Sequence, residues 1–332
     1  MTRVLVTGAN GCIGAWVVRD LVTRGVDVIA GDIGSDTHRL DLVMDGESRD
    51  RVVHMTNDVT DLAALERLID VEEVTNIVHL AALQVPFCRD DPPLGAHVNV
   101  VGTVNVFEAV RRRGEGMAPI VYASSIGMFS PRDVDPGSGR LREDADAHPG
   151  NHYGVYKAAN EGNARIYWAD TGVASIGFRP MTVFGPGRDQ GMTSGPSVAI
   201  AAAVLGEPYR IAFGGSTLFQ YAEDVGATFV IASRSGRTGA EVFNLGGNVV
   251  SIDAWIEALE GLVPEAAGLI SHEPAPLPFP AEIDHDRLAA LGTVPVTPWR
   301  TAIGDMVDRY RVLAGDGRLV ARDHGLPVAA TA

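Results

Sequence analysis

The sequence predicts an α/β fold built on a doubly wound parallel sheet. Two observations carry the prediction. Short apolar runs alternate regularly with helical patterns from residue 3 to about residue 180, and a glycine-rich turn follows the first apolar run at once. Continuous apolar runs are typical of strands that helices cover on both faces. Ligands of such sheets bind at the carboxyl ends of the strands, where we therefore look for functional residues.

The first apolar run, Arg3 to Val6, leads into a turn from Thr7 to Gly14, and a helical pattern extends from about Ile13 to Thr23. A strand, a glycine turn and a helix in this order form a phosphate cradle, because glycines allow a tight turn and a close approach of backbone to pyrophosphate. The predicted cofactor contacts in this turn are Gly8, Asn10, Gly11, Cys12, Ile13 and Gly14.

The second strand, Val26 to Ala30, ends at Gly31 and Asp32. An acidic side chain at this place accepts hydrogen bonds from the adenosine ribose hydroxyls and repels a 2′-phosphate, so we predict NAD rather than NADP. The alternative is that Asp32 is an ordinary turn residue at a strand end.

Polar and small residues follow the later strands at the same edge of the sheet. The further elements that we predict are strands at Val52 to Met55, Asn76 to Leu80 and Pro119 to Ala123, and helices at Leu62 to Ile69 and Pro93 to Arg113. The strand ends carry Asp58-Val59, Leu80-Ala81-Ala82 and Ser124-Ser125. Adjacent serines are often turn formers, but with Tyr153 in reach one of them becomes a hydrogen-bond donor to a substrate oxygen.

Lys157 is the only lysine of the chain, and it lies four residues after Tyr153. On a helix this spacing places both side chains on one face. A nearby ammonium favours phenolate, which brings tyrosine towards the range where it exchanges protons with an alcohol or ketone. The alternative is that the lysine is solvated and the tyrosine merely packs.

Composition limits the partners. The formal net charge is −15 and the only basic block is Arg111-Arg112-Arg113, so nucleic acid and anionic membranes are not expected partners. Two cysteines and the absence of a leader pattern favour a reducing cytoplasm. The apolar run from Val198 to Leu205 is too short to cross a bilayer. We predict no metal ion.

Together these residues resemble the extended short-chain dehydrogenase/reductases, also called the NAD-dependent epimerase/dehydratase family. The motifs that carry the resemblance are Thr7-Gly8-x-x-Gly11-x-x-Gly14, Asp32, Asp58-Val59, His79-Leu80-Ala81-Ala82, Val98-Asn99-Val100-x-Gly102-Thr103, Tyr122-Ala123-Ser124-Ser125, Tyr153-x-x-x-Lys157 and Arg179-Pro180-x-x-Val183-Phe184-Gly185-Pro186-Gly187.

The resemblance implies a role for each matching residue. Tyr153 would be the acid/base, Lys157 would hold the nicotinamide ribose and lower the tyrosine pKa, Ser125 would bind the reacting oxygen, and Asn99 would support the site. The implied NAD contacts beyond the glycine turn are Asp32, Asp58, Val59, Leu80, Ala81, Ala82, Asn99, Tyr153, Lys157, Pro180 and Val183.

The resemblance also implies a Rossmann domain joined to a smaller C-terminal substrate domain. Residues 1–184 would form the NAD-binding domain, to which 222–247 return, and residues 185–221 and 248–332 would form the substrate domain. It further implies a homodimer through the helices Pro93 to Arg113 and Tyr153 to Asp170. Val100, Val104 and Phe107 would supply an apolar stripe, unless that stripe faces the protein's own sheet.

Departures from the family pattern bear on the substrate. Nucleotide-sugar members usually carry Asn where this chain has Thr182, and an arginine in the stretch that here reads Thr217 to Ala222. Loss of that arginine removes a partner for a diphosphate, although Arg188 or Arg210 could compensate. Dehydratases carry an Asp-Glu pair where this chain has Ile126-Gly127. The predicted substrate contacts are Gln84, Ser125, Thr182, Arg188 and Gln220.

Three functions remain open. We favour an NAD-dependent oxidoreductase that transfers a hydride between NAD and a carbinol or ketone carbon of a small polyhydroxylated substrate, such as a sugar or sugar acid. The alternative is an NAD-dependent sugar or nucleotide-sugar epimerase, such as a UDP-hexose 4-epimerase, because the hydride site is the same. A non-catalytic NAD-binding regulator is the third, and the intact set of Ser125, Tyr153 and Lys157 disfavours it.

Overall fold

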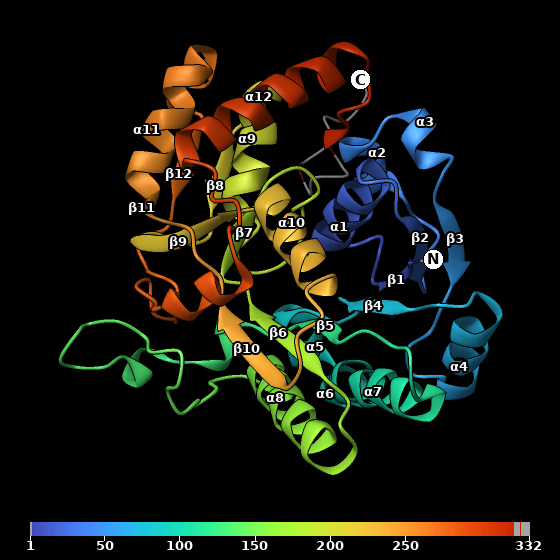
Figure 1. The fold of residues 1–332 in the computed structure, drawn as a ribbon. Coiled ribbons are helices and arrows are strands. Elements are labelled where there is room, and N and C mark those ends of the chain that lie inside the picture. The colour runs from blue at the N-terminus through green and yellow to red at the C-terminus, as the bar shows by residue number, and fades with distance from the viewer. Residues whose placement is uncertain (1, 322–325, 327–332) are drawn as a thin grey trace.

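The computed structural model describes residues 2–321 and residue 326. Its centre is a seven-stranded sheet in the order β10-β6-β5-β4-β1-β2-β3, with every neighbouring pair parallel (Figure 1). The strands are β1 (Arg3–Thr7), β2 (Asp27–Asp32), β3 (Val53–Thr56), β4 (Asn76–His79), β5 (Ile120–Ala123), β6 (Ser175–Arg179) and β10 (Ala240–Asn244). The strand order reverses between β1 and β4, which confirms the predicted doubly wound α/β fold.

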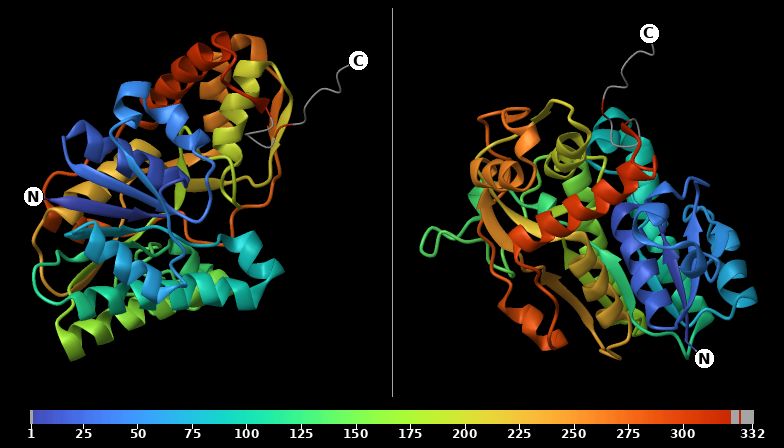
Figure 2. Two further views of the ribbon diagram at one scale, coloured as in Figure 1. Left: turned by 90° about the vertical axis from the view of Figure 1, so that its right-hand side faces the viewer. Right: turned by 90° about the horizontal axis from the view of Figure 1, so that it is seen from above.

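Helices cover both faces of this sheet (Figure 2). On one face α1 (Cys12–Thr23) packs against α10 (Ala222–Ser233), and on the other lie α4 (Leu62–Val71), α7 (Gly102–Arg113) and α8 (His152–Thr171). Successive side chains of β1 point to opposite faces of the sheet, so Val4 and Val6 join the core cluster on one face and Leu5 joins the cluster on the other. The sheet is thus buried on both faces, as the apolar runs predicted.

The helix predicted from Pro93 to Arg113 is not uniform. It consists of α6 (Pro92–Ala96), a π-helical turn η1 (His97–Val101) and α7. The widened turn carries Asn99, whose side chain is hydrogen-bonded to the backbone of Leu83. Such turns are frequent at functional sites. The short helices α2 (His38–Val43), α3 (Gly46–Arg49) and α5 (Val85–Asp90), which we did not predict, fill connections between the strands.

The apolar stripe predicted on α7 lies only partly at the surface. Phe107 is fully buried and packs edge-on against Tyr122 of β5, with ring centroids 5.9 Å apart, so it faces the protein's own sheet. Val100 and Val104 are half-buried. The prediction that Phe107 lies in a contact between subunits is therefore wrong.

A second region follows β6. The strands β7 (Thr182–Phe184), β9 (Ser216–Tyr221) and β11 (Asn248–Ser251) form a three-stranded sheet, and β8 (Tyr209–Ile211) pairs with β12 (Ile270–His272). Its helices are α9 (Gly195–Leu205), α11 (Ile252–Leu262) and α12 (Trp299–Gly315), and the remaining short turns are η2 (Ile126–Met128), η3 (Pro131–Asp133), η4 (Pro264–Ala266) and η5 (Asp286–Leu291). The chain leaves the large sheet after Arg179, earlier than the predicted boundary at residue 184, and returns to it in β10.

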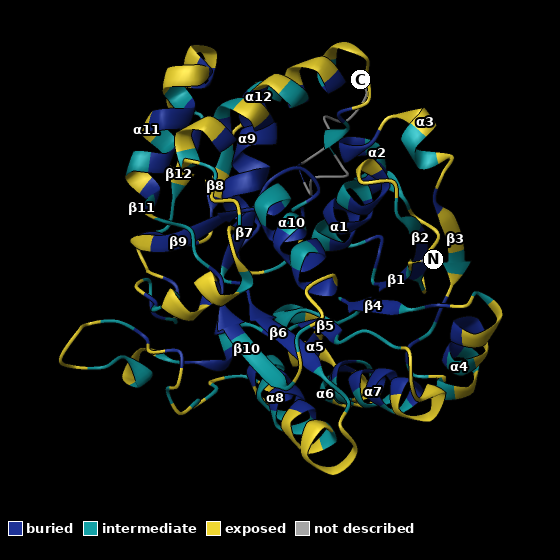
Figure 3. Ribbon diagram, viewed as in Figure 1, coloured by how far each residue is buried: buried dark blue, intermediate teal, exposed yellow. Residues whose placement is uncertain are grey.

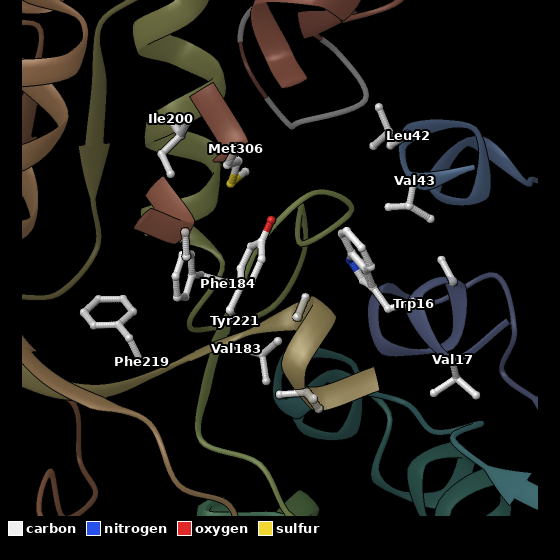
Figure 4. Close-up of a cluster of buried hydrophobic side chains, with 14 of the residues drawn as sticks. Trp16, Val17, Leu42, Val43, Val183, Phe184, Ile200, Phe219, Tyr221 and Met306 are labelled. Carbon is white, nitrogen blue, oxygen red and sulfur yellow. The ribbon is translucent and has the colours of Figure 1, made fainter. Parts of the chain in front are cut away.

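One hydrophobic core joins the two regions. Figure 4 shows Tyr221 of β9 between Phe184 of β7 and Trp16 of α1, with ring centroids 5.4 Å and 6.1 Å from that of Tyr221. The helix α9 is buried on nearly every side, as its uniformly apolar sequence requires, whereas exposed residues gather on the outer helices and loops (Figure 3). Because both regions share this closely packed core, their positions relative to one another are fixed.

Three sequence expectations concern the described residues as a whole. No helix within residues 2–321 has the length and apolar character needed to cross a membrane. Cys12 and Cys88 are both free. No three or more His, Cys, Asp or Glu side chains of the described residues are grouped as metal ligands would be.

Candidate active site

A cavity of about 210 Å³ opens at the carboxyl ends of β1, β4 and β5, where the sheet reverses its order. It lies between the large sheet and the second region. Residues that we predicted as cofactor, catalytic or substrate contacts make up much of its wall. Those lining it are Gly8, Gly11, Cys12, Ile13, Gly14, Leu80, Ala82, Gln84, Ser125, Tyr153, Lys157, Pro180, Val183 and Arg188.

The glycine turn has the tight geometry of a phosphate cradle. Gly8 has a φ of +70°, and a Cβ there would lie 2.6 Å from the amide nitrogen of Ala81. A Cβ at Gly14 would lie 2.3 Å from the carbonyl oxygen of Gly8. Any side chain at either position would push the turn away from the strand or the helix. The turn therefore leaves the first amides of α1 open to the cavity, and this fits the pyrophosphate of a dinucleotide.

Asp32 lies at the edge of this cradle. Its Oδ2 accepts a hydrogen bond from the backbone amide of Asn10 at 3.0 Å, and its Oδ1 accepts one from the amide of Gly34 at 3.0 Å. The carboxylate is half-buried and keeps acceptor capacity, which fits a ribose diol. Asp58 caps its own turn by accepting from the amide and hydroxyl of Thr60. The predicted cofactor contacts that do not line the cavity include Asn10, Asp32, Asp58, Val59 and Ala81.

Tyr153 and Lys157 lie on α8. The N-cap residue of this helix is Asn151, whose side-chain oxygen accepts a hydrogen bond from the amide of Gly154. The Lys157 Nζ lies 5.5 Å from the centre of the Tyr153 ring and donates to the carbonyl oxygen of Ala123 at 2.7 Å. Burial lowers the pKa of Lys157 to about 8. Ser125 lies two residues beyond the end of β5 and lines the same cavity.

The prediction that Lys157 lowers the tyrosine pKa is not met in this structure. Burial raises the pKa of Tyr153, and hydrogen bonding with Ser125 together with the charge of Arg188 only partly opposes that effect. The ammonium of Lys157 instead donates to the carbonyl of Ala123. Burial thus favours the hydroxyl form of Tyr153, which can donate a proton.

Asn99 does not line the cavity. Its Oδ1 accepts from the Leu83 amide at 2.7 Å and its Nδ2 donates to the Leu83 carbonyl at 2.9 Å. Its own carbonyl accepts from Asn160 of α8 and from Thr103. Asn99 thus joins the loop that carries Gln84 to α8.

Two predicted substrate contacts lie elsewhere. The Thr182 hydroxyl is fully buried and shares a hydrogen bond of 2.7 Å with the Thr217 hydroxyl. Gln220 is 3% exposed, accepts from the Met181 amide and donates to the Leu245 carbonyl. Neither lines the cavity, because each satisfies polar groups inside the second region. The expectation of direct contact is corrected for both.

Arg188 and Gln84 meet at the far end of the cavity. The Nη1 of Arg188 lies 3.4 Å from the Gln84 Oε1, and its Nη2 donates to the Thr193 hydroxyl at 3.1 Å. The Arg188 Nε is buried and has no hydrogen-bond partner among the described residues. A guanidinium held in this way can bind an anion with little reorganisation.

Sequence reasoning missed a buried network behind the serines. The Ser124 hydroxyl donates to the Glu161 carboxylate at 2.5 Å, and Arg179 donates to both oxygens of Glu161 at 2.8 and 2.7 Å. The i, i+4, i+8 spacing of Tyr153, Lys157 and Glu161 could have revealed that Glu161 shares their helix face. Phe279, which also lines the cavity, gave no signal within its proline-rich segment.

Comparisons with known proteins agree with this geometry. A profile of the NAD dependent epimerase/dehydratase family matches residues 4–246. UDP-glucose 4-epimerase of Mycolicibacterium smegmatis is 32% identical over 252 residues, which cover 74% of this chain and 78% of that protein. The match to UDP-glucuronate 4-epimerase 2 of Arabidopsis thaliana is 33% identical and covers 55% of this chain but only 42% of that protein.

A solved structure supports the cofactor. The Thermus thermophilus UDP-glucose 4-epimerase in complex with NAD superimposes with a TM-score of 0.78 at 27% identity, covering 93% of this chain and 99% of that one. The fold, the glycine cradle and the family profile agree, so NAD is the cofactor that the site is built for. The chain belongs to the NAD-dependent epimerase/dehydratase family, the extended short-chain dehydrogenase/reductases.

Proposed function

We propose that this protein is an NAD-dependent oxidoreductase that acts on a carbinol or ketone carbon of a small sugar-acid-like substrate. The charge of the cavity carries the proposal. The described residues that line it include two cations, Lys157 and Arg188, and no carboxylate. A wall with this charge favours an anionic substrate over a neutral sugar.

The proposed chemistry uses Ser125, Tyr153 and Lys157. NAD, when bound, accepts or supplies the hydride. In reduction the Tyr153 hydroxyl donates its proton to the carbonyl oxygen and becomes phenolate, and in oxidation the Tyr153 phenolate accepts the proton of the substrate hydroxyl. Ser125 donates to the same oxygen. Lys157 holds α8 against β5 through Ala123 and supplies positive charge.

The shape of the site supports a small substrate. The positions where nucleotide-sugar members would carry their anchors are occupied by inward-facing residues. Phe219 is fully buried and stacks on Trp255 with ring centroids 4.3 Å apart, and Thr182 is bonded to Thr217. Phe279 closes the cavity from the C-terminal segment. A single directed hydride transfer suits a ligand fixed in one orientation.

A nucleotide-sugar epimerase is the second candidate. The three proteins named above support it, because all are 4-epimerases of UDP-sugars. In that case Arg188 would bind the diphosphate rather than a carboxylate.

A turnover screen with matched substrates separates the candidates. The purified protein is given NAD with glucuronate or galacturonate, with glucose or galactose, and with UDP-glucose or UDP-glucuronate. NADH absorbance and proton NMR of the sugar are followed. The proposal expects NADH with an acid and little with the neutral sugar of the same configuration. Epimerised UDP-sugar without NADH would replace it by the second candidate.

We also propose that Asp32 binds the adenosine ribose. Its free acceptor capacity supports this role, since a 2′-phosphate beside the carboxylate would be repelled. Dissociation constants for NAD and NADP test it, and equal or tighter binding of NADP would refute it.

A homodimer is proposed through the outer surface of η1 and α8. Val101, Val155 and Ile166 are 41%, 48% and 60% exposed there, which is unusual for large apolar side chains on one surface. Light scattering at micromolar concentration tests this, and a monomeric mass would refute it.

A further inference from the structure

The loop from Gly185 to Ser194 joins β7 to α9 and presents two neighbouring charges in different directions. Arg188 lines the cavity beside Gln84 and Thr193. The next residue, Asp189, does not line it and instead contacts α2, beyond the edge of the glycine turn. A displacement of the Asp189 backbone would shift the neighbouring backbone of Arg188, because one rigid peptide unit joins their Cα atoms.

Asp189 is held by a buried, bidentate ion pair. Its side chain is 2% exposed. The Arg39 Nε donates to one carboxylate oxygen at 2.9 Å and the Nη2 to the other at 2.7 Å, while the His38 Nε2 lies 3.0 Å from the first oxygen. Paired, charge-assisted bonds of this kind fix geometry as well as add energy. The contact is long-range, since 150 residues separate the partners.

Arg39 continues the contact into the cofactor cradle. Its Nη1 donates to the Asn10 carbonyl at 3.0 Å, and the Asn10 amide donates to Asp32 at 3.0 Å. The Asn10 side chain donates to the Gly34 carbonyl at 2.7 Å. An unbroken series of hydrogen bonds through Arg39 and Asn10 thus connects Asp189 to Asp32, the proposed ribose acceptor.

The backbone of the loop fits closely against the same arginine. Gly187 has a φ of +86°, and a Cβ there would lie 3.3 Å from the Arg39 Cβ. The Pro186 carbonyl accepts a hydrogen bond of 3.1 Å from the Trp16 indole of α1. The start of the loop is therefore fixed to the nucleotide-binding side, whereas Arg188 and Thr193 stay at the substrate end.

We propose that the Asp189–Arg39 pair couples the adenosine edge of the cofactor site to the substrate end of the cavity. Occupation of the adenosine edge stabilises Asn10 and Arg39, Arg39 holds Asp189, and the loop then keeps Arg188 in place. Asp189 and Arg39 are positioning residues that act through Arg188. Binding at the two ends is consequently reciprocal, each end strengthening the other. The substrate role of Arg188 rests on the proposed function, but the coupling itself does not.

Hydrogen exchange of the full-length protein with ADP tests the coupling. ADP carries the adenosine and the diphosphate but lacks the nicotinamide half, so it does not reach the substrate end directly. Exchange of the amides from residue 187 to 194 is measured with and without saturating ADP, and calorimetry establishes saturation for each variant. In the parent, ADP should slow exchange in this segment by about tenfold, and in Asp189→Asn by less than about twofold.

Matched variants keep the result interpretable. Asp36→Asn removes a carboxylate that also contacts His38 but is 77% exposed, and it should behave as the parent. Arg39→Lys keeps the charge but not the bidentate geometry, so it should lose the protection even if Asp189→Asn does not fold. Equal ADP protection in the parent and in a folded Asp189 or Arg39 variant would overturn the proposal, as would a lack of protection in the parent. Neither result depends on which substrate is turned over.

Discussion

The two walls of the cavity are built differently. The nucleotide wall, from β1 to β5, consists mainly of backbone and small residues whose positions follow from short local motifs, such as the turn from Gly8 to Gly14. The opposite wall carries side chains such as Arg188, Met192 and Phe279, which long-range contacts put in place. A cofactor shared by a whole family can be held by backbone, whereas a particular substrate must be recognised by side chains.

A substitution on α8, the helix that carries Tyr153 and Lys157, should slow the chemical step without weakening NAD binding at the nucleotide wall. Tyr153→Phe removes only the oxygen that exchanges the proton, so turnover should fall by about 10³-fold or more while the NAD dissociation constant stays within about twofold. Tyr156→Phe is the matched control, because its hydroxyl bonds the Pro92 carbonyl outside the cavity. Turnover of Tyr153→Phe near the parent value would exclude Tyr153 as the acid/base.

Lys157→Arg should impair both functions although it keeps the charge. The Lys157 side chain is buried and reaches the Ala123 carbonyl as a compact donor, and a wider guanidinium does not fit that position. We expect turnover to fall by roughly 100-fold and NAD affinity by about tenfold, measured by steady-state kinetics and calorimetry. A variant with parental kinetics would show that the single lysine is an accident of composition.

The opposite wall should control selectivity rather than chemistry. Arg188→Gln removes a charge-assisted partner, so KM for an acidic substrate should rise by about 10- to 100-fold with kcat less affected. Arg210→Gln is the control, because Arg210 is 61% exposed and pairs with Glu273 on the surface. If both variants raised KM equally, the charge of the cavity would not determine the substrate.

Beneath the nucleotide wall, His79 should make stability depend on pH. It contacts the Thr7 hydroxyl at 2.7 Å and the Thr103 hydroxyl at 3.0 Å, and burial lowers its pKa from 6.5 to about 3. The unfolded chain therefore binds more protons between these values, and stability is lost as pH falls below 6.5. From pH 7 to 5.5 the parent should lose roughly 1 kcal/mol more unfolding free energy than His79→Gln, by denaturant titration. Equal losses of unfolding free energy in the two proteins would show that His79 does not cause this pH dependence.

The same contrast explains what the sequence could predict. The turn from Gly8 to Gly14 and the pair Tyr153 and Lys157 depend on spacing within short segments, and the structure brings them to the wall of one cavity. Asp32, predicted from its place after the second strand, accepts a hydrogen bond from Asn10 of that turn. The doubly wound parallel sheet followed from the β/α alternation. These features are local, so a linear pattern contains them.

The errors fall where tertiary contacts decide. Thr182 and Gln220 were expected in the cavity, but Thr182 is hydrogen-bonded to Thr217 and Gln220 to Met181 and Leu245, so both side chains face inward. The π-helical turn at Asn99 depends on hydrogen bonds to Leu83, which no helix propensity encodes. The Arg39–Asp189 pair joins segments that have no common motif. Such contacts cannot be predicted from a local sequence pattern, because they form only when distant segments come together in the fold.

Following the hydride tests most directly whether the protein is an oxidoreductase rather than an epimerase. The protein is purified without added cofactor, freed of small molecules by gel filtration, and given the acidic substrate identified by the screen, with and without NAD. We predict one NADH for each product molecule, formed only when NAD is added, because a small substrate held in one orientation undergoes a single transfer. A product of inverted configuration formed without net NADH, by protein that retains its cofactor through gel filtration, would contradict it.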